Sequence, residues 1–177
     1  MPNPALRRSI RHGFVVGLLA SVAHLAWEYT HGGVASHHLL ANPDMPAVSN
    51  GWGLLLLPFL GWLASRNAIR RAGPDNAAAA RSLAGFLVAL AVGLALSLSF
   101  NAGLESVSSG IFFAALASGL FLRTYRAECI FGFVLGMTFV LGSILPTIAA
   151  LVGAAISAVA FFVIRPTMAR LLVAVRA

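Results

Sequence analysis

The chain has 177 residues, of which 59% are hydrophobic and 10% are charged, and its formal net charge is +7. A soluble domain carries about 25% charged residues, so the composition excludes an ordinary soluble domain and predicts a protein of the bacterial inner membrane. The basic residues are all arginines beside apolar segments, where they contact lipid headgroups and set orientation, so we expect no nucleic-acid partner. The single cysteine, Cys129, excludes an internal disulfide.

Apolar segments of spanning length follow one another along the chain and predict one transmembrane domain, residues 1–177. A hydrocarbon core about 30 Å thick needs about 20 residues of helix. The predicted fold class is all-α, a polytopic bundle of six transmembrane helices. These helices are expected at about 11–31, 47–65, 82–100, 107–122, 129–145 and 148–164.

Two segments need a specific interpretation. The loop 34–50 contains several turn-forming residues, and within it we expect one short interfacial turn of helix at 36–40. The apolar run 129–164 would be about 54 Å long as a single helix, much longer than the hydrocarbon core. We therefore predict that it folds back on itself at Pro146.

The arginines predict the orientation of the bundle. In a six-helix arrangement all twelve fall on one side, whereas a five-helix arrangement would scatter them over both faces. By the positive-inside rule both termini are then cytoplasmic. The arginines are Arg7, Arg8, Arg11, Arg66, Arg70, Arg71, Arg81, Arg123, Arg126, Arg165, Arg170 and Arg176.

The first predicted helix carries a narrow polar stripe. Gly17, Ser21, His24, Glu28 and His31 are separated by steps of three and four residues, so they share one face of a helix. Ionisable groups inside a membrane are costly and usually face a cavity or a partner. We therefore expect this face to point into the bundle.

The predicted outer loops add further polar residues at the same end. The candidate metal ligands are His24, Glu28, His31, His37 and His38. The candidate substrate-binding residues are Asp44, Trp52, Asn101 and Glu105, and no catalytic residue is assigned.

Imidazole and carboxylate groups together suit one divalent transition metal ion, such as zinc, iron, copper or nickel. The spacing of Glu28 and His31 is also used in di-iron bundles, but these need a second copy, which the chain lacks. The same groups would also suit proton transfer, because histidine titrates near neutrality. The alternative to a functional site is a purely structural role, in which His24 and Glu28 form a hydrogen-bonded pair and the loop histidines are solvated.

Three functional hypotheses follow. The first is a membrane protein that binds or transports a small solute or a metal ion at its outer mouth. The second is a metal-dependent membrane enzyme acting on a lipid-linked or outer-face substrate. The third is an accessory subunit whose outer loop binds a membrane protein partner. A P-loop and the H-E-x-x-H motif of zinc proteases are both absent from the sequence.

Overall fold

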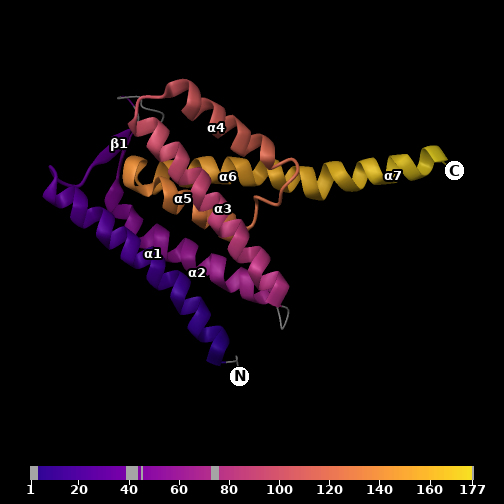
Figure 1. Cartoon of the computed structure of the whole chain (residues 1–177), viewed down its shortest axis with the longest axis horizontal. Coiled ribbons are helices and arrows are strands. Elements are labelled where there is room, and N and C mark those ends of the chain that lie inside the picture. The colour runs from indigo at the N-terminus through magenta and orange to yellow at the C-terminus, as the bar shows by residue number, and fades with distance from the viewer. Residues whose placement is uncertain (1–3, 39–43, 45, 73–75, 177) are drawn as a thin grey trace.

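The computed structural model describes residues 4–38, 44, 46–72 and 76–176. The protein is all-helical apart from one short hairpin (Figure 1). The elements are α1 (Pro4–Thr30), β1 (Ser36–His38), β2 (Ala47–Ser49), a 3-10 turn (Asn50–Trp52), α2 (Gly53–Ala72), α3 (Asn76–Asn101), α4 (Glu105–Ser118), α5 (Ala127–Leu141), α6 (Ile144–Val159), a π-helical segment (Ala160–Ile164) and α7 (Arg165–Arg176).

Helices α1 and α2 pack directly backbone to backbone. A side chain at Gly13 would overlap with the carbonyl group of Gly61, and one at Gly17 would overlap with the backbone of Leu57. Small residues allow helices to approach this closely, which is a common way of pairing helices where the hydrophobic effect contributes little. The sequence places glycine at the positions where the two helices touch.

Helix α5 is at the centre of the bundle and packs against α2, α3 and α6. Its contact with α3 is again made by glycines, because Gly132 lies against the backbone of Phe86 and Gly136 against that of Leu90. Large apolar side chains of α2 and α5 fill the space between these two helices and form the core. The buried members of this core are Leu57, Leu60, Ala64, Ala127, Phe131 and Val134.

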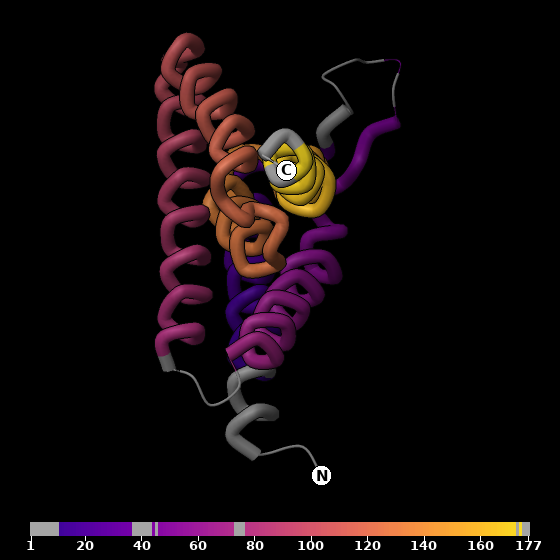
Figure 2. The backbone as a smooth tube through the Cα atoms, turned by 90° about the vertical axis from the view of Figure 1, so that its right-hand side faces the viewer, coloured from indigo at the N-terminus to yellow at the C-terminus, as the bar shows by residue number. Residues whose placement is uncertain are grey.

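Contacts between helix ends define two opposite ends of the bundle. At one end, which we call the arginine end, Arg71 of α2 pairs with Glu128 of α5, and Arg165 donates to the carbonyl oxygens of Leu120 and Phe121. At the other end, which we call the His24 end, α1 meets the hairpin, the start of α2 and the turn between α5 and α6. Figure 1 shows β1 beside the end of α1 that lies farthest from the N-terminus, and in Figure 2 α2 begins in the upper half of the view and runs downward from there.

Among the described residues, two helical stretches are both long and apolar enough to cross a membrane. They are Ala77–Asn101 and Ile144–Leu172, the latter combining α6, the π-helical segment and most of α7. Helix α5 is apolar but shorter. Figure 1 shows α7 continuing the direction of α6 away from the other helices.

The hairpin corrects the prediction for the first loop. Strand β1 pairs with β2 in antiparallel register, with Ser36 opposite Ser49. The helical turn expected at 36–40 is therefore wrong over 36–38, and residues 39 and 40 lie outside the described part. The second helix does not begin at 47 but at Gly53, because residues 47–52 form the strand and the 3-10 turn.

The fold-back between the last two predicted helices lies earlier than expected. The chain turns at Gly142, which has a positive φ of 67°. Pro146 lies inside the first turn of α6, where a missing N–H costs nothing because that group has no helical acceptor. The helix expected to end at 164 continues to Arg176, and helices α1, α2 and α3 extend further into the predicted polar connections.

Candidate functional site at the His24 end

The polar stripe on α1 faces the bundle, as expected. Ser21 is 1% exposed and His24 3% exposed, and the side chain of Glu28 is 11% exposed. Val22, on the opposite side of the helix, is 49% exposed. The prediction that this face points inward is confirmed for Gly17, Ser21, His24 and Glu28.

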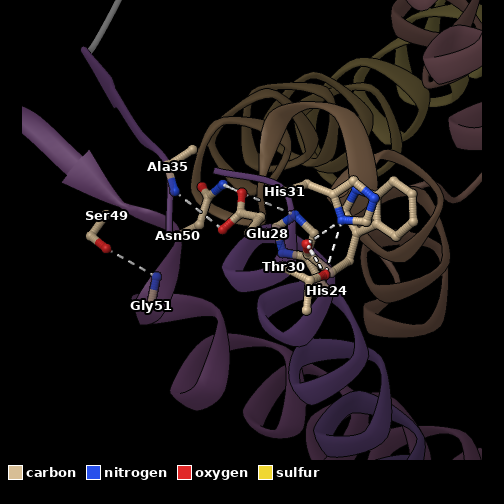
Figure 3. A network of polar contacts seen from close by, with 9 residues as sticks. His24, Glu28, Thr30, His31, Ala35, Ser49, Asn50 and Gly51 are labelled. Carbon is tan, nitrogen blue, oxygen red and sulfur yellow. Dashed lines mark hydrogen bonds and ion pairs between the residues drawn. The ribbon is translucent and has the colours of Figure 1, made fainter. Parts of the chain in front are cut away.

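The carboxylate of Glu28 is the centre of a compact group of contacts (Figure 3). Oε1 accepts a hydrogen bond from Nδ2 of Asn50, and Oε2 accepts one from the backbone N–H of Ala35 at 3.3 Å. Nε2 of His24 lies 3.4 Å from Oε1. We call these four residues, His24, Glu28, Ala35 and Asn50, the Glu28 cluster.

Local backbone geometry explains how Ala35 reaches the carboxylate. Gly32 and Gly33 have φ values of 121° and 101°, a conformation that glycine adopts without steric cost. They turn the chain back over the end of α1, where the N–H of Gly33 bonds to the backbone oxygen of Glu28 at 2.9 Å. The carbonyl of Ala35 then accepts from the N–H of Asn50 at 3.0 Å, so the hairpin brings Asn50 over the same carboxylate.

The turn between α5 and α6 closes the cluster from the other side. A side chain at Gly142 would overlap with Oδ1 of Asn50, and the ring of Phe139 lies edge-on to His24 with 5.4 Å between the ring centres. Ser143 is 1% exposed, and its Oγ has no hydrogen-bond partner among the described residues. Three separate segments of the chain therefore enclose the Glu28 cluster.

His31 does not join the cluster. Its ring is stacked on Trp27, with 3.6 Å between the ring centres, and its Nδ1 lies 2.9 Å from the carbonyl oxygen of Trp27. The residue is exposed at the end of α1. The helical stripe therefore ends at Glu28, because α1 ends at Thr30 and His31 lies exposed in the turn that follows.

The other predicted site residues occupy different places. Asn101 and Glu105 are exposed at the turn between α3 and α4, and no contact joins them to the Glu28 cluster in the part of the chain that the structure describes. Trp52 is 58% exposed and Asp44 is exposed. His37 and His38 lie in β1, two and three residues beyond Ala35, but their side chains are outside the described part.

Comparison of the chain with protein-family models, with curated proteins and with solved structures gives no match in any of the three.

Three residues of the site, Ala35, Asn50 and Gly142, are outside the candidate sets predicted from the sequence. Ala35 and Asn50 belong to the loop 34–50, and Gly142 lies far from it in the chain. The signal for Asn50 is its position in Ser-Asn-Gly directly before a helix, a pattern typical of a turn and cap. Ser49 does act in this way, since its Oγ accepts from the N–H of Gly51 at 3.2 Å.

The distance between His24 and Glu28 fits two ligands of one metal ion, but a third charged or imidazole ligand is not found among the described residues. Two atoms that each lie about 2.0–2.2 Å from a tetrahedral ion are about 3.3–3.6 Å apart, and the Nε2–Oε1 distance is 3.4 Å. No group of three or more His, Cys, Asp and Glu side chains is found among the described residues. Asn50 turns its Nδ2 toward Glu28 and its Oδ1 toward Gly142, so a third protein ligand would come from a histidine of β1, whose side chains lie outside the described part.

Proposed function

We propose that this chain is a multi-pass protein of the bacterial inner membrane, with six helices, α1 to α6, crossing the bilayer and both termini in the cytoplasm. The two spanning-length helical stretches support a membrane location. The contacts at the arginine end support the orientation, because they join the end of α2 to the start of α5 and the end of α4 to the end of α6. Arginine-rich ends gathered on one side are what the positive-inside rule expects.

This topology predicts the behaviour of reporter fusions. A reporter fused after Gly33 or after Gly103 is expected to be on the outer side of the membrane, and one fused after Ala72 or after Arg123 in the cytoplasm. Paired alkaline phosphatase and green fluorescent protein fusions at each site measure this. Phosphatase activity after Ala72, or fluorescence after Gly103, would contradict the proposed orientation.

We further propose that the Glu28 cluster binds one divalent metal ion at the outer end of the bundle. The observation that carries this proposal is the pair of His24 Nε2 and Glu28 Oε1, nearly buried and separated by the distance that two ligands of one ion have. A buried carboxylate is costly unless charge or hydrogen-bond donors compensate it. Asn50 and Ala35 supply two donors, and a cation would supply the opposite charge.

The packing of α1 on the inner side of the Glu28 cluster favours a site that binds a metal ion over a path that conducts the ion along α1. On the same face of this helix, one and two turns deeper than Ser21, Gly17 and Gly13 lie against the backbone of α2. An ion held by His24 would therefore meet close-packed backbone rather than further ligands. The geometry therefore supports binding within the Glu28 cluster rather than passage of an ion along α1.

We expect Glu28→Gln to abolish metal binding and to leave the helical fold intact. The substitution keeps the shape and removes the charge, and loss of a ligand should weaken binding by more than the roughly 10–100-fold lost with an outer hydrogen-bond partner. Purified protein would be stripped with chelator and reloaded with Zn²⁺, and zinc per chain would be measured by mass spectrometry. One zinc per chain is expected in the wild type and none in Glu28→Gln or His24→Ala.

His12→Ala is the control, because His12 is exposed near the arginine end of α1. It should retain one zinc per chain and the wild-type melting temperature. Zinc should raise the melting temperature of the wild type and of His12→Ala only, because a ligand that binds the folded state stabilises it. Equal zinc in the wild type and in both cluster variants would contradict the proposal.

A specific observation favours a second candidate, a structural clamp in an accessory subunit. Glu28 already accepts hydrogen bonds from Asn50 and Ala35, and these contacts hold the hairpin to α1. In that case Glu28→Gln would lower the melting temperature equally with and without zinc. The outer hairpin would then be the surface that a membrane protein partner recognises.

A further inference from the structure

A cavity of about 610 Å³ lies near the arginine end, between α3, α4, α5 and α6. Its volume is within the range of about 300–1,000 Å³ that small-molecule sites occupy. Most of its wall is apolar and comes from all four helices. Representative lining residues are Val88, Val92, Phe112, Leu116, Phe133 and Ala150.

A second cavity of about 400 Å³ adjoins the first and shares Phe112 and Ala149 with it. Its wall is also apolar and includes Leu96 and Leu145. Both cavities lie along the face of α4 that looks toward α5 and α6, where packing is loose because α4 packs mainly on α3. We call the two cavities together the α4 groove.

The mouth of the α4 groove carries an excess of positive charge. Among its described lining residues are four arginines and one acid, Glu128, which is already paired with Arg71. Two of the arginines pack on the same aromatic ring, because the guanidinium carbons of Arg123 and Arg165 are 5.4 and 3.9 Å from the centre of the Phe161 ring. Four arginines against one paired acid leave this part of the groove with a net positive charge, which an anion would offset.

Two buried polar atoms also border the groove. Oγ1 of Thr124 and Oε1 of Glu128 have no hydrogen-bond partner among the described residues, and both residues line the cavity. Buried polar atoms are rarely left unpaired without a reason. Both atoms are covered by the protein, so they indicate imperfect packing in the wall of the groove and are not themselves contacts for a ligand.

We propose that the α4 groove holds one anionic phospholipid of the phosphatidylglycerol type. Its phosphate lies at Arg123, Arg126 and Arg165, and an acyl chain occupies the apolar groove. An apolar tunnel with a cationic mouth complements this amphipathic anion, and a basic pocket between helices on the cytoplasmic side is a known setting for anionic lipid headgroups. The proposal rests on the membrane location proposed above and is independent of the metal site.

Native mass spectrometry of the full chain in detergent tests the proposal. The protein would be delipidated, exposed to equal amounts of phosphatidylglycerol and phosphatidylethanolamine, and the adducts counted. We expect one phosphatidylglycerol per chain, about tenfold more than phosphatidylethanolamine, because the charge-assisted hydrogen bonds of the arginines favour the net anion. Inorganic phosphate should not displace the lipid, because it lacks the apolar chain.

Two variants separate the polar and apolar parts of the groove. Arg123→Gln combined with Arg126→Gln should reduce the preference for phosphatidylglycerol about tenfold or more. Ala115→Trp, which fills the groove without changing charge, should reduce retention of both lipids. Arg11→Gln, an exposed arginine outside the groove, is the matched control and should behave as the wild type.

Equal retention of both lipids by the wild type would overturn the proposal, as would wild-type selectivity in the double arginine variant. So would a lipid-free dimer, because a helix of a second copy would then fill the groove. Circular dichroism of each variant identifies loss of fold, and the double arginine variant changes only residues outside the buried core. Membrane fractionation of the expressing cells, before detergent is added, tests the membrane location separately.

Discussion

Gly17→Ala is expected to separate α1 from α2 and to lower the stability of the protein by about 3 kcal/mol or more, at the upper end of what overpacking costs. The added methyl group would overlap with the backbone of Leu57, including its carbonyl oxygen. A backbone atom cannot move aside as a flexible side chain can, so the two helices must shift apart along their whole contact. The melting temperature in detergent, followed by circular dichroism, measures the loss.

Gly110→Ala is the matched control for this prediction. Gly110 lies in α4, and a methyl group there meets nothing within 4 Å. Alanine in a helix interior is favoured over glycine by roughly 0.5–1 kcal/mol, so this variant should be as stable as the wild type or slightly more stable. If both substitutions had the same small effect, close backbone contact between α1 and α2 would be excluded.

Gly142→Ala is expected to have the second largest effect and to act on the Glu28 cluster as well as on stability. Gly142 has φ 67° and ψ −169°, a conformation almost confined to glycine. A methyl group there would also overlap with Oδ1 of Asn50, so Asn50 must leave its position beside Glu28. Backbone strain of about 1–3 kcal/mol and loss of the Asn50–Glu28 hydrogen bond then add together.

Gly103→Ala separates these two contributions. Gly103 also has a positive φ, 69°, but a methyl group there meets nothing within 4 Å. It should lose stability through backbone strain alone and keep full zinc binding, whereas Gly142→Ala should lose both. Zinc content per chain and melting temperature of the two variants provide the comparison. Full zinc binding by Gly142→Ala would remove Asn50 from the proposed site.

The helical character of the protein could be predicted because apolar runs and the arginines between them are signals of the local sequence. The inward face of α1 was also predictable, since Ser21, His24 and Glu28 follow the helical period. The hairpin was not, because three-residue strands such as Ser36–His38 carry no periodic signal of their own. Pro146 did not mark the last turn, because proline also fits the first turn of a helix, where its missing N–H would have had no helical acceptor.

The centre of the candidate site was predictable and its partners were not. His24 and Glu28 lie one helical turn apart, so their proximity follows from α1 alone. The contact of Glu28 with Asn50 depends on the turns at Gly32 and Gly142. These turns bring together segments that are far apart in the sequence, so no local pattern predicts the contact. His31 fits the helical period as well as Glu28 does, but its ring stacks on Trp27 and does not face the bundle. The helical period alone does not distinguish these two outcomes.

The order of the segments around Glu28 has a consequence for biosynthesis. Asn50 follows Glu28 by 22 residues, and Gly142 follows Asn50 by 92 residues. At about 5–20 residues per second, Asn50 is synthesised roughly 1–4 s after Glu28, and Gly142 about 5–18 s after Asn50, whereas His24 is already present. The nascent chain therefore holds an incompletely enclosed acid while most of the bundle is being synthesised. Ribosome-bound intermediates that end before Gly142 should expose Glu28 to carboxyl-reactive reagents that the finished protein excludes.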